Sequence, residues 1–157
     1  MRKDAVINSN QDAETRPLRL GRARAALIVY RIVQGQPRFL LVSSARNPDK
    51  LTLPGGKIDR DESPARAAMR ETAEEAGVVT NRPRDLGDYL HRKRARRYHP
   101  TQTFIAEFAG SLKEREARTR LWLSLEEIAD AGLVLRKPIR KQIKQAARLI
   151  DRRRLAA

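Results

Sequence analysis

Three glutamates, Glu71, Glu74 and Glu75, stand close together near the middle of the chain, after a glycine pair at 55–56. In a helix, residues three and four apart share one face, and like charges at that spacing cost about 0.2–0.5 kcal/mol per pair. Arg70 can neutralise one carboxylate. Mg²⁺ suits the others, because it binds a few carboxylates together with waters and substrate phosphates. The glycines would let the backbone approach such a metal or a phosphate closely.

The charge pattern alone has a simpler explanation, which is a solvated acidic face on an alanine-rich helix. The spacing argues against it, because five residues separate Gly56 from Glu62 and seven more separate Glu62 from the run 70–78. This arrangement resembles the signature of the Nudix hydrolases. Thr72 departs from the signature by standing where an aliphatic residue is expected. The resemblance implies hydrolysis of a phosphoanhydride with the help of a divalent metal.

Short motifs outside this region resemble the diphosphoinositol polyphosphate phosphohydrolase branch of the same family. Two positions depart from that branch. Leu51 replaces an expected tryptophan, and Lys57, an added cation beside the glycine pair, stands where a third glycine is expected. The motifs lie between residues 22 and 145, at 24–26, 40–49, 99, 120–122 and 137–138.

The resemblance implies a metal site and a phosphate-binding pocket. The metal, Mg²⁺ with Mn²⁺ as the alternative, would be bound through Gly55, Glu71, Glu75 and Glu74. Basic and polar side chains would surround the phosphates, because a densely charged ligand needs cationic hydrogen-bond donors. The predicted substrate-binding residues are Arg22, Arg24, Ser44, Arg46, Arg97, His99, Arg120 and Lys137.

The remaining catalytic assignments concern support of the carboxylates and proton transfer. We expect Arg70 to hold the carboxylates by charge-assisted hydrogen bonds, and Glu62 to support them or to order a water. Glu74 is the first candidate for the general base and Glu107 is the second. An exposed charge on an edge strand explains Glu107 equally well.

Apolar patterns predict the strands of a sheet. Continuous runs over 25–30 and 38–43, separated by a turn at 34–37, predict a strand pair that is covered on both faces. Alternation over 103–108 predicts a strand with Phe104, Ala106 and Phe108 on one face. The segment 120–123 reads as the last strand.

Two longer helices are predicted beside these strands. Ser63 as N-cap, Pro64 in the first turn and Gly77 past the last turn delimit the helix that carries the glutamates. The final helix, about 138–154, directs an apolar stripe inward and its Lys and Arg side chains outward. The resemblance implies an α/β fold, the Nudix α/β/α sandwich, with a mixed central β-sheet between the two helices.

Length and charge bound the function further. The 157 residues suit one domain, which we place at 21–157 after a mobile N-terminal arm over 1–20. The formal net charge of +15 favours a polyanionic partner such as nucleic acid, an anionic membrane or a phosphate-rich small molecule. Three Phe, three Tyr and one Trp offer little base stacking, so nucleic acid is not favoured.

The absence of cysteine and of any long apolar run predicts a soluble cytoplasmic protein with no membrane contact. The oligomeric state is left open. We expect a Mg²⁺-dependent phosphohydrolase that cleaves a diphosphoinositol polyphosphate or a dinucleoside polyphosphate. The alternative within the family is a house-cleaning nucleoside triphosphate pyrophosphohydrolase. The alternative of another class is a non-catalytic polyanion- or RNA-binding module.

Overall fold

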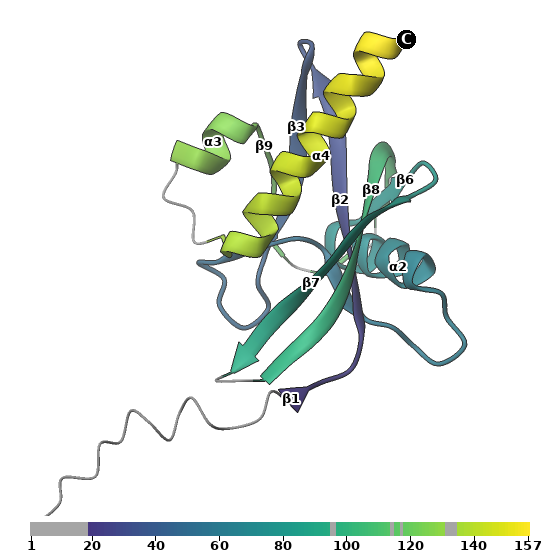
Figure 1. Ribbon diagram of the computed structural model, residues 1–157, viewed down its shortest axis with the longest axis vertical. Helices are drawn as coiled ribbons and strands as arrows, with labels where there is room; N and C mark the ends of the chain where they lie inside the picture. The colour runs from purple at the N-terminus through teal and green to yellow at the C-terminus, as the bar shows by residue number, and fades with distance from the viewer. Residues whose placement is uncertain (1–18, 95–96, 114, 117, 131–134) are drawn as a thin grey trace, which may run out of the picture.

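The computed structural model describes residues 19–94, 97–113, 115–116, 118–130 and 135–157. Strands precede and follow the glutamate helix, and two helices end the chain. The elements are β1 Arg19–Leu20, β2 Arg24–Val33, β3 Gln36–Ser43, β4 Leu51–Thr52, β5 Gly55–Lys57, α2 Pro64–Ala76, β6 Val78–Thr80, β7 Arg84–Arg94, β8 Arg97–Ser111, β9 Arg120–Leu123, α3 Leu125–Asp130 and α4 Lys137–Ala156 (Figure 1).

Strand β2 lies at the centre of the described sheet. It pairs in parallel with β8 and antiparallel with β3 and β5, so the sheet is mixed, as predicted. The run 25–29 is buried on both faces of the sheet, which explains why this strand reads as a continuous apolar stretch. The strand order through the sheet is β1-β8-β2-β3-β4, with β5, β6, β7 and β9 pairing from the side.

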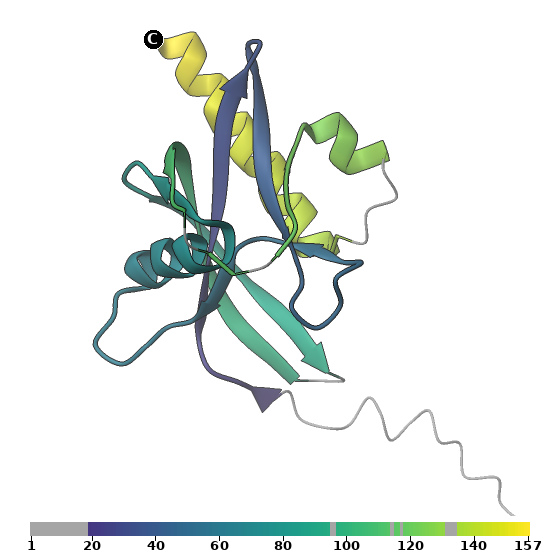
Figure 2. The ribbon, with the colours of Figure 1, turned by 180° about the vertical axis from the view of Figure 1, so that it is seen from behind.

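Helices α2 and α4 cover opposite faces of the sheet. Successive side chains of β2 point to opposite faces, so Leu27 and Val29 pack with the small residues of α2. Ile28 packs instead with Ile139 and Ile143 of α4. Figures 1 and 2 show the two helices on either side of β2 in both views. The expected α/β/α sandwich is therefore confirmed.

The glutamate helix α2 has the predicted caps. Ser63 Oγ accepts a hydrogen bond from the Arg66 amide at 3.3 Å, and Gly77 ends the helix with a φ of +62°. A left-handed φ suits glycine, which has no Cβ to clash. Thr72 is fully buried, and its hydroxyl donates to Ala68 O at 2.7 Å. The departure at Thr72 is thus accommodated inside the helix.

Residues 88–99, a segment rich in Lys and Arg, lie in the hairpin of β7 and β8. Residues 95–96 of this segment lie outside the described residues. The predicted arm over 1–20 needs one correction. Residues 19–20 form β1, which pairs in parallel with β8 through Arg19 and Arg97. Residues 1–18 of that predicted arm lie outside the described residues.

The C-terminal helix α4 begins one residue before its predicted start and continues to Ala156. Its apolar stripe is buried, with Ile143 and Ala146 fully covered. The short helix α3 before it begins with a capping box, in which the Ser124 amide donates to Glu127 Oε2 at 2.8 Å and Ser124 Oγ accepts from the Glu127 amide at 3.1 Å. Among the described residues, no helix is long and apolar enough to cross a membrane.

Candidate active site

The glycine pair lies next to the glutamate helix α2, because β5 pairs with the first half of β2 and α2 packs on the same part of the sheet. Gly55 and Gly56 pair with Ala26 and Ala25 of β2, next to the last turns of α2. The Gly55 amide donates a hydrogen bond to Glu75 Oε2 at 3.2 Å. A Cβ on Gly56 would collide with the carboxylate of Glu71. The absence of a side chain at this glycine therefore leaves room for the acidic group.

Glu75 is a buried carboxylate with only 5% of its surface exposed. Burial raises the pKa of Glu75 to about 7, against the opposing effects of Arg118 and the Gly55 amide. Arg118 Nη2 lies 3.3 Å from Glu75 Oε1. A buried carboxylate with a raised pKa at the wall of a pocket is typical of a functional site.

Arg70 connects the other acidic side chains. Its guanidinium contacts both carboxylate oxygens of Glu62, at 2.9 and 3.1 Å, which is a bidentate pair. It also contacts Glu71 Oε1 at 2.9 Å and Glu74 Oε2 at 3.4 Å. The hydrogen bonds from Arg70 lower the pKa of Glu62. Arg70 thus has the contacts expected of a residue that holds the carboxylates in place.

The donor set fits Mg²⁺ better than a metal that needs a complete protein cage. Among the described residues, no three acidic or histidine side chains converge on one point. Glu71 and Glu75 come from α2 and flank the glycine pair, whereas the side chain of Glu74 is 50% exposed. Because Mg²⁺ takes one or two carboxylates and fills its octahedron with waters and phosphates, two carboxylates beside the glycine pair suit it, and Glu75 also lines an open pocket.

A pocket of about 490 Å³ opens beside Glu75. Four of the predicted substrate-binding residues line it, namely Arg24, Ser44, Arg46 and His99. Gly55 and Glu75 form part of the same wall. The other described lining residues are Ala45, Asn47, Lys50, Leu51, Thr52, Leu53, Lys57, His91, Arg118, Leu135, Arg136 and Ile139.

His99 is held in a defined orientation at the edge of this pocket. Its Nδ1 lies 2.9 Å from Arg22 O, and because a carbonyl oxygen only accepts, Nδ1 carries the proton of that hydrogen bond. The ring is 4% exposed, and within the described part of the chain its Nε2 has no hydrogen-bond partner. A Cβ on Gly21 would collide with the ring. The His99 ring is therefore held in one orientation, with its Nε2 unpaired.

The other four predicted substrate-binding residues do not line the pocket. Arg22 lies near it and donates to Ile58 O at 3.2 Å. Arg120 donates to Ala76 O at 2.9 Å and so caps the C-terminal end of α2. Arg97 is exposed beside β1 at the start of β8, where it pairs with Arg94 of β7. Lys137 borders a separate hollow of about 830 Å³ between β7, α3 and α4.

Glu107 lies away from the site, so its expected role as a candidate base is corrected. It pairs with Tyr30 in the β2–β8 register, four positions along β2 from Ala26, which lies opposite Gly55. Tyr30 packs on the α4 side of the sheet, so Glu107 projects to the face opposite α2. The edge-strand explanation also needs correction, since β8 has neighbours on both sides here.

Sequence reasoning missed several pocket residues. Arg118 lies in the segment before β9, which carries no helical or strand pattern. Lys50 and Arg136 also line the pocket, but each lies one residue outside a motif that the resemblance identified, at 40–49 and at 137–138. His91 faces His99 across the β7–β8 hairpin, and burial, with the charges of Arg136 and Arg24, lowers the pKa of His91 to about 4. The Lys and Arg residues around His91 in the sequence could have indicated that this segment contributes to a phosphate-binding pocket.

Comparisons with known proteins agree with this geometry. The NUDIX domain family matches residues 21–146. Diphosphoinositol polyphosphate phosphohydrolase 3-beta of Bos taurus is 34% identical over 131 residues, which cover 80% of this chain and 77% of that protein. Diphosphoinositol polyphosphate phosphohydrolase 2 of Homo sapiens is also 34% identical over 131 residues, covering 80% of this chain and 70% of that protein.

Solved structures show the same fold. A C. elegans Ap4A hydrolase binary complex has a TM-score of 0.65 at 20% identity, covering 83% of this chain and 98% of that one. The NUDIX domain of Shewanella oneidensis NrtR complexed with ADP ribose has a TM-score of 0.68 at 20% identity, covering 92% and 99%. The chain therefore belongs to the Nudix family. It is a Nudix hydrolase, an enzyme that acts on pyrophosphate bonds.

Proposed function

We propose that this enzyme is a Mg²⁺-dependent hydrolase of phosphate-rich substrates, either diphosphoinositol polyphosphates or dinucleoside polyphosphates. The observation that carries the proposal is the composition of the pocket wall. Its described lining includes six cationic side chains and one carboxylate, Glu75, and contains no Phe, Tyr or Trp. Arg118 is paired with Glu75, but cations gathered around one pocket favour an anionic ligand. The described lining also offers no aromatic side chain on which a base could stack. The 34% identity to diphosphoinositol polyphosphate phosphohydrolases supports the same substrate class.

The residues of the chain divide the work of such a reaction between them. Glu71 and Glu75 would hold Mg²⁺, with the Gly55 backbone close by, and Mn²⁺ is the alternative ion. When bound, the metal lowers the pKa of a water and stabilises negative charge on the transferred phosphoryl group. Glu74, which is exposed, is the candidate to accept the proton of the attacking water. Arg70 orients Glu71 and Glu74 through its hydrogen bonds.

The cationic wall would bind the phosphates that are not transferred. Arg24 and Arg46 come from different segments, β2 and the loop after β3, and both reach the pocket. An arginine fork can form two hydrogen bonds with one phosphate, which adds geometric selectivity to charge attraction. His99 lines the same pocket, and its unpaired Nε2 offers one more polar atom to a ligand.

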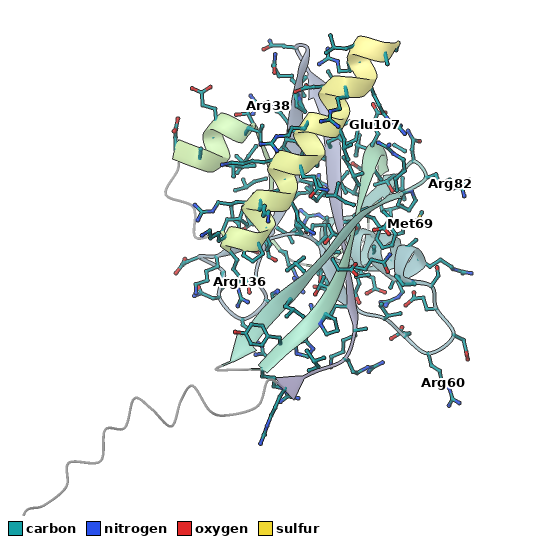
Figure 3. The ribbon with its side chains drawn as sticks, in the orientation of Figure 1. Arg38, Arg60, Met69, Arg82, Glu107 and Arg136 are labelled. Carbon is teal, nitrogen blue, oxygen red and sulfur yellow. The ribbon has the colours of Figure 1, made fainter. Side chains whose placement is uncertain are left out.

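The test is kcat/KM for three substrate classes: a diphosphoinositol polyphosphate, a diadenosine polyphosphate and a nucleoside triphosphate, each with Mg²⁺ and with chelator. We expect metal-dependent turnover with preference for one of the first two. Arg24→Ala and Arg46→Ala should each lower kcat/KM by about 10-fold or more, as expected when a charged hydrogen bond of about 1.5–3 kcal/mol is lost. Arg60→Ala and Arg82→Ala, exposed sites outside the pocket lining, are the matched controls (Figure 3).

Two results would count against the proposal. Preference for the nucleoside triphosphate, unchanged by Arg24→Ala and Arg46→Ala, would indicate a house-cleaning nucleotide hydrolase. No metal-dependent turnover of any of the three would favour a non-catalytic polyanion-binding module.

A further inference from the structure

The outward face of α4 carries a continuous row of cations. Lys141, Lys144, Arg148 and Arg152 follow one another at intervals of three, four and four residues, so they share one face of the helix. All four are exposed. The buried residues Ile139, Ile143, Ala146 and Ile150, at intervals of four, three and four, lie on the opposite face, against the sheet.

The protein itself does little to neutralise this row. Within the part of the chain that the structure describes, none of the four cations forms an ion pair with a carboxylate. Asp151 is the only acidic residue in α4. Like charges three and four residues apart destabilise a helix, so the row lowers the stability of α4 unless something outside the chain neutralises it.

The row is also separate from the catalytic pocket. The pocket is lined by Arg136 and Ile139 at the start of α4, and none of the four cations is among its described lining residues. Figure 1 shows α4 lying across one face of the sheet, and Figure 2 shows α2 on the other. A ligand on the outer face of α4 would therefore leave the catalytic carboxylates uncovered.

We propose that Lys141, Lys144, Arg148 and Arg152 form a second binding surface, for the phosphate backbone of a double-stranded nucleic acid. The row spans about 16 Å at 1.5 Å per residue. Duplex nucleic acid matches it because B-form DNA carries about one negative charge per 1.7 Å of axis. The binding is independent of base sequence, since lysine and arginine contacts to phosphates carry no sequence information.

Two features of α4 favour a duplex over a single strand or a membrane surface. Single strands are bound by stacking their bases on aromatic side chains, and α4 contains no aromatic residue. A helix that binds a membrane surface inserts an apolar face into the lipid, but the apolar stripe of α4 is buried against the sheet. The row therefore offers positive charge, but no aromatic side chains for bases to stack on and no exposed apolar face to insert into a membrane.

The test is fluorescence anisotropy of the full chain with a labelled 20-base-pair duplex of mixed sequence, as DNA and as RNA, at 50 and 200 mM salt. We compare wild type with the triple variant Lys141→Gln, Lys144→Gln, Arg148→Gln. A matched triple variant, Arg60→Gln, Arg82→Gln, Lys113→Gln, removes the same net charge from exposed positions elsewhere. Circular dichroism checks the fold of both variants, and the Glu75→Gln variant separates nucleic-acid binding from catalysis.

The row variant should bind the duplex at least about 30-fold more weakly at 50 mM salt. Its slope of log K against log salt should fall by about 2.7, because each phosphate contact contributes about 0.9. The matched variant and Glu75→Gln should stay within about threefold of wild type. Equal losses in the two triple variants would overturn the proposal, since net charge alone would then explain binding. Tighter binding to a single strand or to phosphatidylserine vesicles than to both duplexes would overturn it too.

Discussion

Arg118 Nη2 lies 3.3 Å from Glu75 Oε1, while its Nε lies 2.8 Å from Glu116 Oε2. One arginine thus links the buried carboxylate of α2 to the segment before β9. The Glu116 amide donates to Glu74 O at 2.8 Å, which fixes that segment on the end of the helix. A cation held this close to Glu75 opposes the approach of a second cation to the same carboxylate.

Arg118→Gln should therefore strengthen binding of Mg²⁺ in the absence of substrate. We expect the Mg²⁺ dissociation constant to fall by about 10-fold at pH 8.5, where Glu75 is ionised, because the repulsion of a nearby unit charge is lost. Isothermal titration calorimetry measures the change, with Arg60→Gln as the matched control. Weaker Mg²⁺ binding by the Arg118 variant would show that the arginine supports the metal site instead.

The raised pKa of Glu75 predicts how the metal-free protein responds to pH. The folded pKa of about 7 lies above the ordinary value of 4.5, so the folded state binds this proton more tightly than the unfolded state. The resulting contribution to stability is fully present below pH 4.5 and is lost as the pH rises to 7 and above. Glu75→Gln keeps a neutral side chain at every pH and escapes that loss.

In chelator, Glu75→Gln should gain stability relative to wild type by about 2–3 kcal/mol between pH 4.5 and pH 8, as a shift of this size implies. Urea unfolding at the two pH values measures the gain. Glu126→Gln removes an exposed carboxylate from α3 and is the control. A difference between wild type and Glu75→Gln that does not change with pH would mean that Glu75 is not protonated in the metal-free protein near neutral pH.

Arg70→Lys tests whether the arginine fork positions the carboxylates. Lysine keeps the positive charge but cannot contact both oxygens of Glu62 while also reaching Glu71. We expect kcat to fall by about 10–100-fold with little change in KM, because outer contacts of this kind orient metal-binding groups. Steady-state kinetics at saturating Mg²⁺ provide the measurement. Loss confined to KM would place Arg70 in substrate binding.

The local parts of the fold could be predicted from the sequence because their signals are local. The caps of α2 depend on Ser63 and Gly77 themselves, and both were found where expected. The face of Glu107 depends on the strand register, which brings it to the α4 side of the sheet. The predicted alternation correctly placed Glu107 and Phe104 on opposite faces of the strand. Alternation alone does not show which of the two faces carries the site, because that depends on the register with β2.

The pocket wall was harder to predict because its cations come from distant segments. Arg24 and Arg46 were found through short motifs, and both line the pocket. Arg120 and Arg118 lie two positions apart, yet Arg120 caps α2 while Arg118 reaches Glu75. Only the path of the chain between β8 and β9 decides between them. Lys137 likewise borders the neighbouring hollow because of where α4 begins.

The most direct test of the central claim is turnover of the best substrate as Mg²⁺ is titrated, compared among wild type, Glu71→Gln and Glu75→Gln. Each substitution keeps the shape of the side chain and removes one metal-binding charge. We predict saturable Mg²⁺ dependence in wild type, loss of at least about 100-fold in kcat in both variants, and intact folding by circular dichroism, with Glu126→Gln behaving as wild type. Turnover within a few-fold of wild type in both variants would contradict the metal assignment and the hydrolase mechanism built on it.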